Sequence, residues 1–534
     1  MAEYEKNQPK KSTIMCSTWL VITIILMLLP RPAMSLSSKK INFFKTAAAS
    51  TSSSSSSPGK SAKHLFTASV ETAKLRAISA RALAYNLTRS NAKHGGRRTA
   101  VDDCLELLDI SLEELDDVIR SGESRKPNAH DIQTWLSAAL TNQVTCSDSL
   151  GGAASPAAGH VAVDVDLRAT SDMKAQVDVL SKYISNALAL HSSMEGGGGG
   201  GGGGGRRLTG DFPEWVTVAD RKLLEASTEE IRPHAVVAKD GSGTHLTIGE
   251  AIDFAAEKAA GGRSVIYIKA GVYREYINIP TKQKYVSLIG AGKGTSVIVG
   301  SRNAGAGWST YSSATVAAMG AGFIAKGVTI INDSGPGKQQ AVALRVGGDF
   351  SVVYQCSVQG YQDSLYSYAN RQFFRESDIS GTTDFIFGNS AVVLQNCFLQ
   401  PRGGQPNYIT AQGRTDPNQN TGISIQGCTV SGGGTTYLGR PWKLYSRVVY
   451  METSLGGVVS SAGWAPWSGS FGLSTLYYGE YQNTGAGAST SGRVRWPGVH
   501  SAMSVIEASK FTVSSFIAGG AWLPGTGVEY NAGL

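Results

Sequence analysis

Three short phrases in the middle of the sequence align when they are written one beneath the other: Gln340-Ala-Val-Ala-Leu344, Gln362-Asp-Ser-Leu-Tyr366 and Thr383-Asp-Phe-Ile-Phe387. Their first residues are 22 and 21 positions apart. A repeat of this length, with alternating apolar residues and no long helix between its copies, predicts that each repeat forms one coil of a parallel β-solenoid. Asp363 and Asp384 are then expected at the same place on neighbouring coils.

A second column of aligned positions supports the same architecture and predicts how the cysteines pair. Adjacent rungs of a solenoid are about 4.8 Å apart, which fits a disulfide, whereas two rungs, roughly 9.6 Å, do not. We therefore expect a bond between Cys397 and Cys428, and a buried free thiol at Cys356, which faces Ser377. The column consists of Val328, Cys356, Ser377, Cys397 and Cys428, at steps of 28, 21, 20 and 31 residues.

The solenoid is expected to begin after Asp240-Gly-Ser-Gly243. Thr247 to Ala260 has the pattern of a single capping helix. Apolar, strand-like segments follow it, namely 264–269, 286–289, 297–299, 323–331 and 342–346.

Length and charge limit the classes of partner. The 534 residues suffice for two or three domains. The net charge of +8 admits nucleic acid, an anionic membrane or an acidic polysaccharide. From Glu225 to the C-terminus, however, 23 Lys and Arg oppose 19 Asp and Glu, and these basic residues are scattered. That distribution argues against a nucleic-acid-binding stripe.

The N-terminus has the pattern of a secretory signal peptide, which we assign to residues 1–35. Two lysines precede an apolar run from about Ile14 to Leu29, and Ala33-Met-Ser35 offers small residues for cleavage. A retained signal anchor is the alternative, because the run approaches the ~17-residue lower limit for spanning a bilayer. In either case the remainder faces an oxidising compartment, where Asn86-Leu-Thr88 and Asn332-Asp-Ser334 are glycosylation sequons.

A helical domain is expected over residues 62–192, after a serine-rich, disordered spacer over residues 36–61. Apolar residues recur there at three- and four-residue steps in four segments, which predicts an up-and-down four-helix bundle. Cys104 and Cys146 lie in the second and third segments. In a secreted bundle they are the natural pair for an inter-helix disulfide.

A linker is expected over residues 193–224. Its ten consecutive glycines, Gly196 to Gly205, cannot form a packed structure. Arg206-Arg-Leu-Thr209 and Arg221-Lys-Leu-Leu224 follow, and such basic pairs between two domains are sites where a subtilisin-like processing protease could cut. The part after the linker is residues 225–534.

The aspartates of the aligned phrases could form a catalytic pair. Two carboxyl groups on adjacent rungs cannot both ionise without a large cost in electrostatic free energy, so one pKa is raised and the other stays low. One group can then donate a proton while the other acts as base or nucleophile. Stacked aspartates in a solenoid can equally cap turns or bind an ion. Gln340 and Gln362 favour catalysis, because their amides can stabilise an oxyanion. Arg440 could hold one aspartate ionised, and Trp442 offers a face for a sugar ring.

Several long phrases resemble the signature segments of plant pectin methylesterases, over a region that extends from Val236 to the C-terminus. The resemblance implies a right-handed parallel β-helix that removes methyl esters from homogalacturonan and releases methanol, without a metal or an organic cofactor. It also implies secretion through the ER and Golgi to the cell wall. The phrases are Gln340–Arg345, Gly360–Tyr366, Gly381–Gly388, Ile409–Arg414, Asp416–Gly422 and Leu438–Trp442.

The same resemblance assigns roles to individual residues. Asp384 would be the nucleophile that attacks the ester carbonyl, and Asp363 the acid that protonates methanol and then the base that activates water. Supporting roles would fall to Gln340 and Gln362 in the oxyanion hole, to Arg440 in orienting Asp384, and to Trp442 in the substrate groove.

The helical part is similar to the plant invertase and pectin methylesterase inhibitor domain, through Val101–Leu108 and Thr134–Asn142. The chain as a whole thus resembles a pro-enzyme, with inhibitor proteins as further expected partners. Three features depart from these families: the bundle lacks an N-terminal cysteine pair, Ser377 replaces the usual Cys, and the link from Cys428 to Tyr437 is short and glycine-rich.

Two other functions remain open at this point. A β-helix polygalacturonase or pectate lyase would use the same fold and polymer but would cut the chain. Alternatively, the bundle could make the molecule primarily an inhibitor-type binding protein. A serine or zinc hydrolase has no support, because Gly-x-Ser-x-Gly and His-Glu-x-x-His motifs are absent from the sequence.

Overall fold

The computed structural model describes residues 58–91, 98–124, 127–152, 167–196, 232–404 and 406–534. The predicted signal segment, both basic motifs and the glycine run after Gly196 lie outside these residues. Residues 61–534 form one compact unit. Within the described ranges, no helix combines the length and the hydrophobicity needed to cross a bilayer.

The helical segments predicted between residues 62 and 192 are confirmed. The second helix begins with a capping box, in which the Thr99 side chain accepts a hydrogen bond from the Asp102 amide and the Asp102 carboxylate accepts one from the Thr99 amide. The Cys104–Cys146 disulfide joins the second and third helices, with 4.8 Å between the Cα atoms. The helices are α3 (Pro58–Asn91), α4 (Ala100–Glu123), α5 (Ala129–Gly152) and α6 (Leu167–Gly196).

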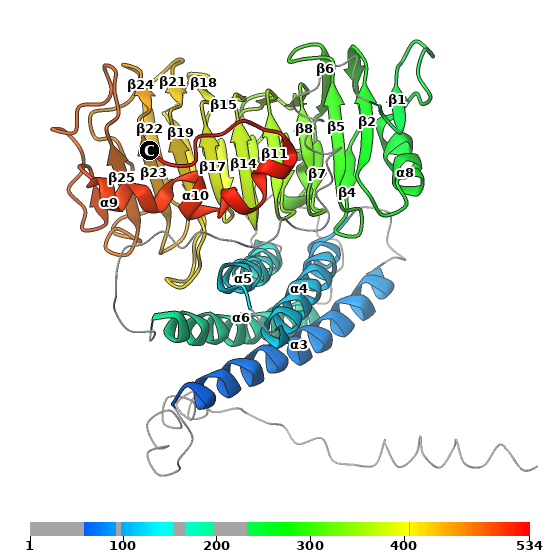
Figure 1. Ribbon diagram of the computed structural model, residues 1–534, viewed down its shortest axis with the longest axis vertical. Coiled ribbons are helices and arrows are strands. Elements are labelled where there is room, and N and C mark those ends of the chain that lie inside the picture. The colour runs from blue at the N-terminus through cyan, green and yellow to red at the C-terminus, as the bar shows by residue number, and fades with distance from the viewer. Residues whose placement is uncertain (1–57, 92–97, 125–126, 153–166, 197–231, 405) are drawn as a thin grey trace, which may run out of the picture. The chain divides into compact units, whose positions relative to one another are not determined.

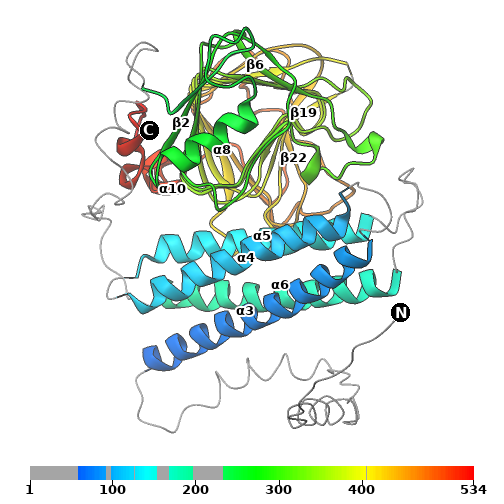
Figure 2. The same ribbon diagram turned by 90° about the vertical axis from the view of Figure 1, so that its right-hand side faces the viewer.

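The β-region is a parallel β-helix in which each full coil contributes one strand to each of three sheets (Figures 1 and 2). The first sheet contains β1 (Ala235–Val237), β2 (Ser264–Ile268), β5 (Val286–Gly290), β8 (Ile324–Lys326), β11 (Ser351–Tyr354), β14 (Arg371–Arg375), β17 (Ala391–Gln395), β20 (Gly422–Gln426), β23 (Arg447–Met451), β25 (Tyr477–Tyr481) and β26 (Val499–His500). The second contains β3 (Gly271–Tyr273), β6 (Ser296–Gly300), β9 (Thr329–Asn332), β12 (Ser357–Gln359), β15 (Asp378–Gly381), β18 (Phe398–Pro401), β21 (Thr429–Val430) and β24 (Ser454–Leu455). The third contains β4 (Ile277–Ile279), β7 (Val316–Ala318), β10 (Leu344–Val346), β13 (Leu365–Ser367), β16 (Ile386–Gly388), β19 (Asn407–Gln412) and β22 (Thr436–Pro441).

The interior of the β-helix is filled by columns of apolar side chains, one from each rung. Each buried aliphatic or aromatic side chain contributes about 1.5–3 kcal/mol relative to exposure, so such columns supply most of the driving force for coiling. One column of the first sheet runs through Ile266, Leu288, Ala325, Val353, Phe374, Leu394, Ile425 and Tyr450, all fully or almost fully buried.

Short helices cover one end of the β-helix and the outer face of its first sheet. The expected capping helix is α8 (Ile248–Lys258), which begins at the N-cap Thr247 and lies at the open end of the coil (Figure 2). The C-terminal segment runs along the outer face of the first sheet, where Phe511, Phe516 and Trp522 pack against its apolar residues (Figure 1). Its elements are α9 (Val505–Ala508), η5 (Ser509–Phe511), α10 (Val513–Phe516), η6 (Gly519–Ala521) and η7 (Leu523–Thr526), and two further 3₁₀ turns, η3 (Ala304–Ala306) and η4 (Tyr311–Ser313), precede β7.

The strand register confirms that the two aspartates are stacked and corrects one step of the predicted alignment. Leu344, Leu365 and Ile386 are paired in successive rungs, so Asp363 and Asp384 both lie two residues before a paired position. Both steps are 21 residues. The predicted first step of 22 was therefore wrong by one residue, because it was counted between phrase starts rather than between paired strand residues.

The predicted column of Cys356, Ser377, Cys397 and Cys428 is in register, but the predicted Cys397–Cys428 disulfide is not present. All three cysteines are buried free thiols. Cys428 Sγ accepts a hydrogen bond from the Cys397 amide at 3.3 Å, while each thiol donates to a main-chain carbonyl of its own coil. Rung spacing therefore brought the two residues together, as expected, but proximity alone did not produce the bond. The free thiol predicted at Cys356 is confirmed.

One of the two glycosylation sequons cannot accept a glycan in the folded chain. Asn332 is buried, and its Nδ2 donates hydrogen bonds to the carbonyls of Arg302 and Val342. The predicted site at Asn332 was therefore wrong, since that nitrogen would carry the sugar. Asn86, in contrast, is exposed on α3.

Candidate functional site

The outer face of the third sheet carries most of the residues singled out in the sequence. Side chains alternate along each strand, so every second residue points away from the interior. The outward column comprises Ala317, Arg345, Tyr366, Phe387, Ala411 and Arg440, one from each successive rung.

Asp363 and Asp384 lie at the start of β13 and β16, with Arg440 from β22 beside them. Both aspartates are buried, and both adopt left-handed backbone conformations, with φ of 65° and 52°. Aspartate tolerates this region better than most residues. Arg440 binds Asp384 through two parallel bonds, Nε to Oδ1 at 2.8 Å and Nη2 to Oδ2 at 2.7 Å. This bidentate geometry fixes the orientation of the Asp384 carboxylate.

The surroundings make the two carboxyl groups chemically different. Burial and the neighbouring Asp384 charge raise the pKa of Asp363 well above its ordinary value. Burial also raises the pKa of Asp384, but the two hydrogen bonds and the charge of Arg440 act against that rise. Asp384 is therefore the group that ionises first, and Asp363 retains the proton. An acid and a carboxylate stand side by side.

Gln340 and Gln362 lie on the two rungs at the edge of this pair. The Ala341 amide donates to the Gln362 carbonyl at 3.2 Å, and the Asp363 amide donates to Thr383 at 3.0 Å, so the segments are adjacent. Both glutamine residues are partly exposed. They lie one residue out of register with each other, because Gln340 and Gln362 are 22 residues apart whereas paired residues of β10 and β13 are 21 residues apart.

Trp442 directly follows β22 and lies over Gly413 of the preceding rung. A Cβ atom at position 413 would come within 2.8 Å of the indole ring, so only glycine permits this approach. The Trp442 ring also contacts Phe387 edge-on, with 5.9 Å between centroids. Trp442 thus contacts the rung that carries Asp384, while its place in the substrate groove stays a prediction.

An unbroken row of aromatic rings, which we call the aromatic floor, connects these rungs and was missed in the sequence. Tyr366 stacks on Phe387 at 4.1 Å between ring centroids. Their equal spacing within two of the aligned phrases could have revealed them, since both occupy the same outward position. The aromatic floor consists of Tyr311, Tyr368, Tyr366, Phe387 and Trp442, and successive centroids are 4.1–5.9 Å apart.

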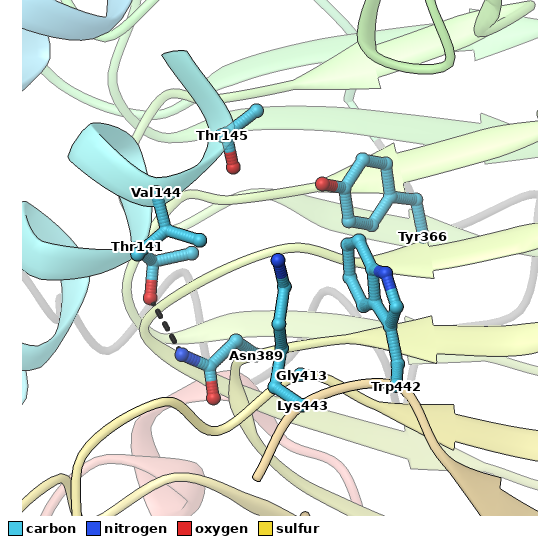
Figure 3. Close-up of a pocket in the computed structure, with 8 residues that line it drawn as sticks. All are labelled: Thr141, Val144, Thr145, Tyr366, Asn389, Gly413, Trp442 and Lys443. Atoms are coloured by element: carbon cyan, nitrogen blue, oxygen red, sulfur yellow. Dashed lines mark hydrogen bonds between the residues drawn. The ribbon is translucent and has the colours of Figure 1, made fainter. Parts of the chain in front are cut away.

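Helix α5 covers the aromatic floor, with Thr141, Val144 and Thr145 opposite Tyr366 and Trp442 (Figure 3). Asn389 Nδ2 donates to Thr141 Oγ1 at 2.9 Å, and Tyr368 Oη donates to Asn142 Oδ1 at 2.8 Å. A cavity of about 10 Å³ remains between α5 and Trp442. That space is about the minimum for one water molecule, so a sugar cannot enter here while the bundle is bound.

Charged groups extend the contact beyond the aromatic floor. Arg371 is buried between Asp349 of the β-helix and Asp131 of α5, with N–O distances of 2.6 Å to each. Glu114 of α4 is also buried and accepts a hydrogen bond from Asn370 Nδ2 at 2.9 Å. Burial raises the pKa of Glu114 well above its ordinary value, and the nearby Asp349 charge adds to this.

Comparison with known proteins identifies both parts of the chain. The family model described as pectinesterase matches residues 234–520, and the one described as plant invertase/pectin methylesterase inhibitor matches residues 41–190. "Probable pectinesterase/pectinesterase inhibitor 35" of Arabidopsis thaliana is 52% identical over 486 residues, covering 89% of both chains. "Probable pectinesterase/pectinesterase inhibitor 16" of the same plant is 48% identical over 524 residues, covering 96% of both.

A solved structure supports the fold assignment independently. The pectin methylesterase from carrot is 53% identical, with a TM-score of 0.56, and its whole chain matches 58% of this one. The chain belongs to the pectinesterase family, and it carries a domain of the plant invertase/pectin methylesterase inhibitor family ahead of the β-helix.

Proposed function

We propose that this chain is the precursor of a pectin methylesterase in which Asp384 is the nucleophile and Asp363 the acid and base. The observation that carries the assignment is that the two carboxyl groups have different hydrogen-bond partners. Arg440 binds Asp384 through both carboxylate oxygens, while Asp363 is buried beside that charge and has no such partner in the described part of the chain.

The first half of the reaction releases methanol. The Asp384 carboxylate attacks the C6 carbonyl carbon of a methyl-esterified galacturonosyl unit, and the carbonyl electrons move onto oxygen. The side-chain amides of Gln340 and Gln362 would donate hydrogen bonds to this oxyanion. When the tetrahedral intermediate collapses, the C–OCH₃ bond breaks, Asp363 gives its proton to the departing oxygen, and an acyl-enzyme anhydride remains on Asp384.

The second half restores the enzyme. Asp363, now a carboxylate, takes a proton from water, and the hydroxide attacks the same carbonyl carbon. The bond to Asp384 breaks, which leaves a galacturonic acid carboxyl group, an ionised Asp384 and a protonated Asp363. The new carboxyl group then loses its proton to solvent, so each turnover yields one methanol, one carboxylate and one proton. Trp442 and the aromatic floor offer faces on which sugar rings can stack.

The precursor role follows from the position of α5 over the aromatic floor. We assign residues 62–192 to the inhibitor-like bundle, 193–224 to the linker and 225–534 to the catalytic part. A subtilisin-like protease that cuts at Arg206–Thr209 or Arg221–Leu224 would separate the bundle from the enzyme. The signal-like N-terminus favours export to the cell wall, where methyl-esterified pectin is the substrate.

Product analysis distinguishes this function from its closest rival. The part spanning residues 225–534 is expected to release methanol from methylated pectin and to leave the length of the polymer unchanged. A polygalacturonase or lyase would instead shorten the polymer and create new chain ends or unsaturated products. Shortening without methanol release would therefore overturn the proposal.

A further inference from the structure

A turn between β6 and β7 holds two carboxylates of the bundle through serine and tyrosine hydroxyls. Ser309 Oγ and Ser312 Oγ both donate to Asp103, the latter at 2.5 Å. Tyr311 Oη donates to Glu106 Oε1 at 2.9 Å. All three donors belong to the β-helix, whereas both acceptors belong to α4.

Arg345 completes this cluster from β10. Its guanidinium carbon lies 3.2 Å from the centroid of the Tyr311 ring, and its side chain is almost completely buried. Among the described residues, Nε and Nη1 of Arg345 have no hydrogen-bond acceptor. Asp103 and Glu106 approach closely enough to act on its charge. A buried cation with free donors is costly, and an anion that replaced the bundle carboxylates would satisfy it.

The two bundle carboxylates that bind this turn also have a positively charged partner within the bundle. Asp103 and Glu106 both pair with Arg98 of the bundle. They therefore remain paired when the bundle leaves, whereas the hydroxyls of the turn lose their acceptors and Arg345 loses the two nearby negative charges. The unsatisfied side of the contact is the side that belongs to the enzyme.

The cluster lies in line with the catalytic residues. Arg345 and Tyr366 are paired in adjacent rungs, and Tyr366 is paired with Phe387 in the next, while Asp384 lies two residues before the start of β16. Tyr311 is itself the first ring of the aromatic floor. A polymer that lies along these rings and passes Asp384 would thus reach the cluster about two to three rungs away, or roughly 10–15 Å.

We propose that Ser309, Tyr311, Ser312 and Arg345 form a subsite for the free carboxylates of galacturonosyl units that have already lost their methyl groups. In the precursor, Asp103 and Glu106 occupy it in place of the substrate. The subsite rests on the proposed function, because it assigns the polymer to the groove of that enzyme. It would favour methyl esters next to a de-esterified stretch over esters in fully methylated pectin.

Two variants of the catalytic part, residues 225–534, test the subsite. The carrot enzyme's whole solved chain corresponds to this part alone, which shows that the β-helix folds without a bundle in that relative. Arg345→Met removes the charge but keeps most of the side-chain stem, and the double variant Ser309→Ala/Ser312→Ala removes two hydroxyls. Arg274→Met is the matched control, because Arg274 is largely exposed and pairs with Asp333 on the surface.

The first measurement is the Kd for a fully de-esterified galacturonate hexamer by calorimetry. Hydrogen bonds to charged groups are among the stronger ones in proteins, so we expect the Kd to rise about ten-fold or more in Arg345→Met and about five-fold in the serine variant. The control should bind as the unmodified protein does. Unchanged binding in both variants would overturn the subsite, and the serine pair decides the matter if Arg345→Met fails to fold.

The second measurement separates affinity from chemistry. On sparsely methylated pectin we expect KM to rise in both variants while kcat stays constant, and on fully methylated pectin we expect neither to change. An equal rise of KM on both pectins would contradict a carboxylate-specific subsite. Binding of the hexamer requires no turnover, so failure of the proposed esterase activity would appear as missing methanol and not as altered Kd.

Discussion

At the scale of single residues, the central feature is the pairing of one aspartate with an arginine. Arg440 donates two hydrogen bonds to Asp384, and its own guanidinium lies over the rings of Tyr408 and Trp467, at 4.2 and 4.5 Å from their centroids. The rings hold the guanidinium plane in place. Burial raises the pKa of Asp384, and the hydrogen bonds and charge of Arg440 oppose that rise, so Asp384 ionises more readily than a buried carboxyl group without a counter-charge.

Removal of that pairing should shift the acidic limb of the pH–rate profile. Arg440→Met leaves Asp384 buried without a counter-charge, so its pKa rises further, and we expect the acidic limb of kcat to move up by about 1–3 pH units. Methanol release measured from pH 4 to 9 checks this. Arg440→Lys keeps the positive charge but cannot form two parallel hydrogen bonds to Asp384, so a smaller shift of the acidic limb is expected. Identical acidic limbs in all three proteins would contradict the assigned role.

The repeat pattern could predict that the two aspartates lie together at the site, but not which of them is paired with the arginine. The repeat spacing predicted that Asp363 and Asp384 stack, and the register confirms it. Which aspartate is paired depends on Arg440, which lies on β22, two rungs after the rung of Asp384, and no local pattern predicts the direction of its side chain. The Cys397–Cys428 disulfide was wrong for a similar reason, because rung spacing gives the distance between two residues but not the bonding of their sulfur atoms.

At the scale of elements, α5 is the helix that blocks the aromatic floor. Val144, Thr141 and Thr145 line the remaining cavity opposite Trp442, and Thr145 faces Tyr366 (Figure 3). The amphipathic pattern of Ile132, Leu136 and Leu140 predicted a helix here, because apolar residues at three- and four-residue steps indicate a buried helix face. It could not tell whether a side chain is buried against another helix or against the β-helix.

A large, charged side chain on this face should activate the uncut chain. In Val144→Arg the cavity of about 10 Å³ cannot hold the new side chain, and overpacking costs about 1–3 kcal/mol, which corresponds to docking weakened roughly 5- to 150-fold. We expect methanol release by the full chain to increase accordingly. Leu75→Arg, on an exposed position of α3, is the control and should leave the activity low. Equal activity in the two variants would show that α5 does not block the site.

At the scale of the whole described chain, the contact between bundle and β-helix contains groups that titrate in opposite directions. Burial keeps Glu114 protonated, so its contribution to docking is fully present below its ordinary pKa and is lost as the pH rises through the raised value. Burial and Arg371 lower the pKa of His130 to about 4. Its contribution is present above pH 6.5 and is lost as the pH falls toward 4.

Alkaline conditions should therefore release the bundle through Glu114. In a chain cut within the linker, we expect the Kd between the two parts to rise by up to about ten-fold per pH unit above pH 4.5, until Glu114 ionises in the docked state. Glu114→Gln has no proton to lose and should flatten this rise. Sedimentation of the cut chain between pH 5 and 8 measures it, and the same slope in both proteins would exclude Glu114 as the cause.

The sequence predicted the two folds at this scale but not their contact. Repeats and periodicity determine a β-helix and a bundle separately, because each depends on its own apolar positions. The contact instead uses polar residues scattered over the sequence, such as Asn370 with Glu114 or Tyr368 with Asn142. No spacing rule connects positions more than two hundred residues apart.

The most direct test of the account is methanol release from methylated pectin by residues 225–534, with and without Asp384→Asn. Asparagine keeps the size of the side chain but cannot attack as a carboxylate, so we predict a loss of at least about a thousand-fold in kcat with little change in the thermal unfolding temperature. Comparable methanol release by the two proteins would contradict the claim that Asp384 is the nucleophile.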